Sequence, residues 1–122
     1  MGSHPINLAL RFILELTALI SIGIWGWNKT DHSFRIILAI GLPILFAAIW
    51  AIFAVPNDPS RSGQTVIVTS GIIRLVIELG IFTLATLAMY NNGDSKLYIF
   101  FAVIVIIHYL VSYDRIIWLL NN

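Results

Sequence analysis

Long apolar stretches separated by short polar segments dominate the pattern of residues along the chain. The four stretches cover approximately 6–27, 34–55, 66–90 and 97–120. Each has at least the ~20 residues that a helix needs to cross the ~30 Å hydrocarbon core of a bilayer at ~1.5 Å per residue. The pattern therefore predicts an all-α membrane protein, built as a four-transmembrane-helix bundle.

Three short polar segments connect the predicted spans, at residues 28–33, 56–63 and 91–95. They are rich in Asn, Asp, Ser, Pro and Gly, which favour turns and helix ends. Short connections make successive helices antiparallel neighbours, so both chain ends should lie on one side of the membrane. We expect a single domain over 5–122, because residues 1–4 resemble the remnant of a cloning tag.

A charged motif, Arg-x-x-x-Glu-Leu, occurs twice inside apolar stretches, beginning at Arg11 and at Arg74. An ungapped alignment of the two halves also pairs polar residues of the connecting segments. The polar identities are Arg11/Arg74, Glu15/Glu78, Asn28/Asn91 and Asp31/Asp94. Because each half contains two spans, both halves keep the same orientation. The sequence predicts two parallel-repeat helical hairpins, at approximately 6–55 and 66–120.

The composition supports a membrane location and excludes several classes of protein. Hydrophobic residues make up 59% of the chain and charged residues 11%, with a mean hydropathy of +0.92, too apolar for a soluble domain. A net charge of +1 without a basic cluster gives no reason to expect nucleic acid. The absence of cysteine excludes disulfides and thiolate metal sites. No cofactor motif or nucleophile-plus-base spacing is present, so an intramembrane enzyme that acts on a lipid-like substrate, with Glu and His as acid–base groups, is the least favoured function.

The charged residues within the spans are the candidate functional site, because ionisable groups at membrane depth are costly and usually functional. Counting along each helix from the aromatic residues at the predicted interface places Glu15, Glu78 and His108 near the midplane. A second layer lies nearer the chain ends. The candidate ligand-binding residues of both layers are Arg11, Glu15, Arg74, Glu78, His108 and Trp50.

Two interpretations of these residues remain open. Arginine and glutamate four residues apart share a helix face, so in one interpretation each pair only fixes helix packing in a structural or accessory subunit. Alternatively, the paired guanidinium groups face an anionic or carbonyl group of a small polar or amphiphilic ligand that the protein binds or translocates. No close His/Glu spacing supports a metal site, and no metal or cofactor is predicted.

Three segments of the chain, at residues 7–16, 35–56 and 71–79, resemble the YrdB-like family of small bacterial membrane proteins. The two Arg-x-x-x-Glu-Leu motifs and the Ala-Ile-Gly-Leu-Pro stretch ending at Pro43 are the most specific parts of the resemblance. The resemblance implies a four-span protein of the bacterial inner membrane. It implies no activity, because the function of the family is unknown.

The basic residues at the two sides of the predicted bundle suggest its orientation and partners only weakly. Basic residues are slightly more numerous on the side of the chain ends, so the positive-inside rule favours cytoplasmic termini. The expected partners are the lipid bilayer and a small-molecule or lipid-like ligand. A homodimer is compatible with so small a bundle, although no specific feature requires one.

Overall fold

The computed structural model describes residues 5–29, 33–56, 67–93 and 96–122. The elements in chain order are α1 (Pro5–Lys29), α2 (Phe34–Ile52), β1 (Phe53–Ala54), β2 (Ile67–Val68), α3 (Gly71–Asn91), α4 (Leu97–Val111) and α5 (Tyr113–Leu120). The predicted tag remnant at 1–4 and parts of all three predicted connections lie outside the described residues, as do Asp31 and Asp94 of the predicted repeat.

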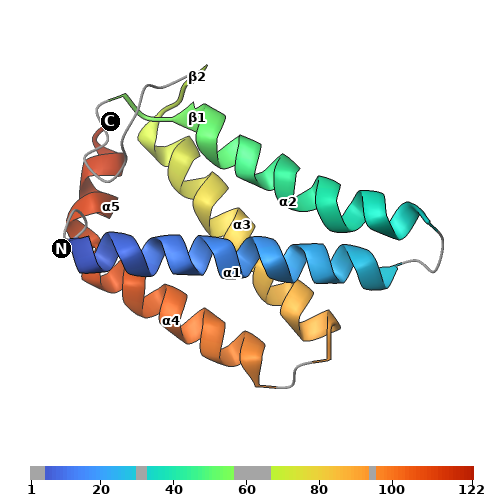
Figure 1. Cartoon of the computed structure of the whole chain (residues 1–122). Helices are drawn as coiled ribbons and strands as arrows, with labels where there is room; N and C mark the ends of the chain where they lie inside the picture. Colours follow the sequence, from blue (N-terminus) through green and yellow to red (C-terminus); the bar gives the residue numbers. More distant parts are fainter. Residues whose placement is uncertain (1–4, 30–32, 57–66, 94–95) are drawn as a thin grey trace.

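The long helices α1 and α2 run antiparallel, and α3 packs against α1 and continues into an antiparallel α4 (Figure 1). Phe82 of α3 lies at the centre of the apolar core. Its ring meets the ring of Trp50 from α2 edge-on, with 5.4 Å between centroids, and that of Tyr109 from α4 at 6.1 Å. Aromatic packing of this kind contributes beyond simple area burial, so Phe82 joins three helices.

The interior face of α1 combines apolar and polar side chains. Its buried positions recur every three or four residues, as expected for one face of a helix, and include Asn7, Arg11, Leu14, Ala18 and Ile22. Leu14, Ala18 and Ile22 enter the core, whereas Asn7 and Arg11 lie towards the start of the helix. The same spacing that buries the core therefore carries Arg11 into the protein interior.

Within the described part of the chain, the helices α1, α2 and α3 are each long and apolar enough to cross a membrane. Large apolar side chains remain exposed on their outer surfaces; on α2 these include Phe34, Ile37, Ile40 and Ile44. Contiguous apolar surface of this extent is stable in contact with acyl chains rather than water. The chain is an all-α membrane protein.

The prediction of one continuous fourth helix over 97–120 is wrong, because the helix breaks at Ser112. Helix α4 has 15 residues and is therefore about 22 Å long, shorter than the bilayer core. Helix α5 leaves it at an angle of 70°, so the two form a fourth span only if the bent pair is counted as one. Ser112 adopts φ −94° and ψ 26°, outside the helical range, which redirects the chain across the end of the bundle.

The second and third predicted spans also end differently from the expectation of 34–55 and 66–90. Helix α2 stops at Ile52, and β1 pairs in parallel with β2, Phe53 opposite Ile67. Helix α3 starts only after Ser70, whose side chain accepts a hydrogen bond from the Ile73 amide as an N-cap. Apolar, partly β-branched residues precede this cap and favour extended backbone, a distinction that apolarity alone does not reveal.

The contact between α5 and the start of α3 supplies a test of the bend. A side chain at Gly71 would collide with the backbone of Leu119, whereas one at Gly80, on the same helix, would meet nothing. We expect Gly71→Ala to lower the free energy of unfolding in detergent by about 1–3 kcal/mol through overpacking. The matched Gly80→Ala should instead raise it by about 0.5–1 kcal/mol. Equal effects of the two substitutions would show that α5 does not pack on α3.

Candidate functional site

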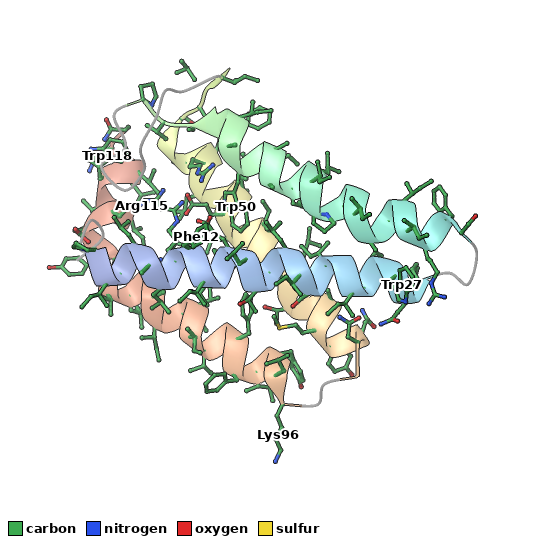
Figure 2. All side chains as sticks on the ribbon, in the orientation of Figure 1. Phe12, Trp27, Trp50, Lys96, Arg115 and Trp118 are labelled. Carbon is green, nitrogen blue, oxygen red and sulfur yellow. The ribbon has the colours of Figure 1, made fainter. Side chains whose placement is uncertain are left out.

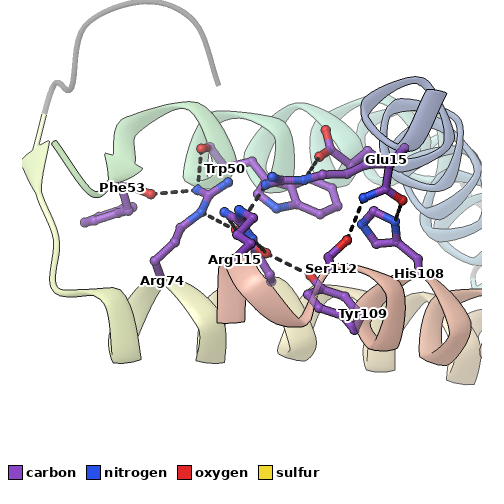
Figure 3. Close-up of polar contacts among 11 residues, drawn as sticks. Glu15, Trp50, Phe53, Arg74, His108, Tyr109, Ser112 and Arg115 are labelled. Carbon is purple, nitrogen blue, oxygen red and sulfur yellow. Dashed lines mark hydrogen bonds and ion pairs between the residues drawn. The ribbon is translucent and has the colours of Figure 1, made fainter. Parts of the chain in front are cut away.

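Glu78 of α3 is the common acceptor of the polar cluster, and its side chain is 0% exposed. Its Oε2 accepts hydrogen bonds from Arg74 Nε at 2.7 Å, Arg115 Nη2 at 2.8 Å and Arg11 Nη2 at 3.1 Å. Its Oε1 accepts from Arg115 Nη1 and from the Tyr109 hydroxyl, both at 2.8 Å. Figure 3 shows Arg74, Tyr109 and Arg115 converging from α3, α4 and α5.

The number of donors explains how a charged carboxylate is tolerated there. Removing an ion from water costs several kcal/mol, which mutual attraction offsets only if the remaining lone pairs are also satisfied. Arg115 supplies both of its terminal nitrogens to Glu78, a bidentate arrangement that adds strength and fixes orientation. The Glu78 carboxylate is thus the point at which α1, α3, α4 and α5 are connected.

Arg74 extends the cluster to the end of α2. While its Nε binds Glu78, its Nη1 donates to the backbone carbonyl groups of Trp50 and Phe53, both at 2.6 Å. These carbonyls are at the C-terminal end of α2, where the helix dipole favours a cation. Among the described residues, Arg74 Nη2 has no acceptor, and the buried indole nitrogen Nε1 of Trp50 has none either.

A pocket of about 470 Å³ lies beside this cluster, between α1 and α2. Glu15 borders the pocket; its side chain is 26% exposed, and its Oε1 accepts from Arg11 Nε at 2.9 Å. In Figure 2 the side chains of Trp50 and Arg115 lie between the ribbons of α1, α3 and α5, and Trp50 lines the pocket. Its polar lining consists of Arg11, Glu15, Trp50 and Arg74.

His108 belongs to a separate polar chain. Its Nδ1 lies 3.0 Å from Asn7 Oδ1, and Asn7 Nδ2 donates to Ser112 Oγ at 2.6 Å. Among the described residues it makes no hydrogen bond to Glu15 or Glu78. The histidine instead links α4 to the start of α1, and the common depth of the two glutamates and His108 stays a prediction.

The structure brings the other five predicted residues together in one cluster. They differ in whether they border the pocket. Arg11, Glu15, Trp50 and Arg74 line the pocket, whereas Glu78 is enclosed behind it. The two copies of the motif make the same contact within their own helix, from arginine Nε to the glutamate four residues later. Only Arg11 also crosses to the other copy, at Glu78.

Comparison with known proteins identifies the family. A protein family described as 'Protein of unknown function (DUF2568)' matches residues 9–106. The chain belongs to the DUF2568 family. It is 50% identical over 116 residues to the uncharacterized protein YrdB of Bacillus subtilis (strain 168), covering 95% of this chain and 94% of that relative. No solved structure matches the chain.

The family assignment confirms the predicted resemblance to YrdB-like proteins and names no activity. The charged residues of the pocket all lie within the DUF2568 match, whereas Tyr109 and Arg115 follow it. The ligand-binding role of the predicted residues stays a prediction.

Sequence reasoning missed three partners of the charged residues: Tyr109, Arg115 and Asn7. In the continuous helix predicted over 97–120, Arg115 lies close to the end of the span and would be at the membrane boundary. The bend at Ser112 instead returns it to the interior. Tyr109 gave no signal, because aromatic residues are common in membrane spans.

Substitution of each glutamate by glutamine tests the difference between the two motif copies. Glu78→Gln leaves three buried guanidinium groups without their shared carboxylate and should lower the free energy of unfolding by about 3–5 kcal/mol. Glu15→Gln removes one partly exposed pair and should cost about 0–1 kcal/mol. Chemical unfolding in a mild detergent measures both. Similar losses would contradict the distinct surroundings of the two carboxylates.

Proposed function

We propose that this DUF2568 protein is a membrane-embedded binding protein for a small polar or amphiphilic ligand, held in the pocket between α1 and α2. The observation that carries the proposal is a pocket lined by both arginine and glutamate on helices that otherwise expose apolar surface. Its volume of about 470 Å³ is within the range of small-molecule sites. Charged side chains at such depth are usually functional.

A hydrogen-bond donor without an acceptor at the pocket favours a ligand with acceptor oxygens over an apolar ligand. Buried donors without partners cost about 1–3 kcal/mol each, so native proteins rarely keep them. The buried Trp50 Nε1 lacks an acceptor among the described residues, and the Trp50 side chain lines the pocket. A bound group with acceptor oxygens would relieve this cost.

The saturated surroundings of Glu78 favour a second role, as a scaffold. Five hydrogen bonds from four side chains leave that carboxylate no capacity for a ligand. A structural or accessory subunit would need only this part of the cluster. We therefore assign helix cross-linking to Glu78 and ligand binding to the side of the cluster formed by Arg11 and Glu15.

We further propose that the protein lies in the bacterial inner membrane with cytoplasmic termini and that its two helical hairpins descend from one repeated unit. The shared Arg–Glu contacts within α1 and α3 support the repeat, although the break between α4 and α5 has no counterpart in α2. Translocation of the ligand and a homodimer remain predictions.

Filling the pocket tests the binding function. Ala47 of α2 borders the pocket, so Ala47→Trp should occupy the space without replacing any of the charged residues. We expect a total polar lipid extract from bacterial membranes to raise the Tm of the wild-type protein, because a ligand that binds only the folded state stabilises it. Ala47→Trp should lose most of this increase.

A matched control separates pocket filling from the effect of a new tryptophan. Ile44, three residues earlier on α2, is 63% exposed and lies outside the pocket. Ile44→Trp should respond to the extract as the wild type does. An equal Tm increase in all three proteins, or none in the wild type, would leave only the scaffold role.

A further inference from the structure

The polar pocket continues as an apolar groove along α1 and α2. A second hollow of about 420 Å³ adjoins it, and Leu16 and Leu19 line both. From there the groove passes Gly23, Ala39 and Pro43 and ends at Trp27. The groove is thus charged at one end and apolar along the rest, which is the distribution of an amphiphile.

Small residues shape the floor of this groove. A side chain at Gly23 would collide with the Ala39 carbonyl and contact Pro43, so the glycine allows α1 and α2 to approach closely. The larger flanking side chain of Ile20 stands above this floor and is 62% exposed. The groove therefore has its floor where α1 and α2 approach closely, has apolar sides, and is open towards the acyl chains of the bilayer.

The length of the apolar section matches one acyl chain. Glu15 and Trp27 are twelve positions apart on α1, or about 18 Å along the axis. One leaflet contributes about 15 Å, half of the ~30 Å hydrocarbon core. Because Arg74 and Trp50 belong to the layer nearer the chain ends, a chain whose phosphate lies beside them would run past Glu15 and along the groove towards Gly23.

The polar end offers both a donor set and an acceptor. Arg74 Nη2 and Trp50 Nε1 are the donors without acceptors among the described residues. Glu15 is the acceptor: its Oε1 binds Arg11, and its Oε2 makes no hydrogen bond within the described part of the chain. A carboxylate binds an ammonium group more strongly than a hydroxyl, so the head group that best satisfies both combines anionic oxygens with a cation.

We propose that the groove binds a membrane phospholipid with a zwitterionic head group of the phosphoethanolamine type. Its phosphate accepts hydrogen bonds from Arg74 and Trp50, its ammonium group donates to Glu15, and one acyl chain lies along Gly23 and Ala39. This inference rests on the proposed ligand-binding function and names the chemical class of the ligand.

Two lipids with identical chains test the head-group assignment. Native mass spectrometry of the purified full-length protein in dodecyl maltoside measures binding of dioleoyl phosphatidylethanolamine and dioleoyl phosphatidylglycerol. We expect the wild type to prefer the ethanolamine lipid by about tenfold, because the glycerol head group offers Glu15 no cation. Glu15→Gln should bring the two affinities close together. Equal binding of both lipids by the wild type would overturn the assignment.

Filling the groove tests whether the acyl chain binds there. Ala39→Phe places a ring on the floor and should weaken binding of the ethanolamine lipid about tenfold. Ala102 lines a separate apolar hollow between α3 and α4, so Ala102→Phe is the matched control and should bind as the wild type does. Unchanged binding by a folded Ala39→Phe protein would overturn the proposed seat.

Fluorescence quenching supplies a measurement that needs no change in the groove floor. An ethanolamine lipid brominated near the chain end should quench Trp27, and Trp27→Phe should lack that component of the quenching. A lipid brominated beside the head group should leave the Trp27 component unchanged. Indistinguishable quenching by the two lipids would contradict the placement of the chain.

The outcomes separate this inference from the function on which it rests. Suppose that the polar lipid extract stabilises the wild type but not Ala47→Trp, while neither Glu15→Gln nor Ala39→Phe alters lipid binding. The pocket then binds a ligand of another class, and the phospholipid assignment fails alone. If no extract or lipid stabilises or binds the wild-type protein, both fail.

Discussion

The buried carboxylate of Glu78 is the interaction on which the rest of this structure depends. Apolar packing between helices is weak in a bilayer, because acyl chains are as apolar as the side chains that they replace. A carboxylate that accepts from three arginines and a tyrosine supplies a directional connection that lipid cannot replace. It also explains the bend at Ser112, since a straight fourth helix would carry Arg115 away from its partner.

The two Arg-x-x-x-Glu-Leu motifs have the same local geometry and different surroundings. In α3 the glutamate is enclosed by donors from other elements, and in α1 it borders a pocket with one arginine as its partner. Arg11 bridges the two carboxylates and so couples the scaffold to the pocket. One sequence pattern therefore serves helix cross-linking in one copy and, as we propose, ligand binding in the other.

Much of the fold and part of the site could be predicted from local sequence, because apolarity and helical spacing act over one or two turns. The first three spans and the Arg11–Glu15 and Arg74–Glu78 contacts follow from such spacing. The break at Ser112 does not, since it accompanies a tertiary contact between Arg115 and Glu78, which are 37 residues apart in the chain. For the same reason, counting along helices could give the depth of His108 but not the direction in which it points.

A double-mutant cycle between Glu78 and Arg115 tests the central connection most directly. The free energy of unfolding in detergent is measured for the wild type, Glu78→Gln, Arg115→Gln and the double variant. Because the two side chains form a bidentate buried pair, the account predicts a coupling energy of about 2 kcal/mol or more. Losses that add to within about 0.5 kcal/mol would contradict it, because residues that do not interact behave additively.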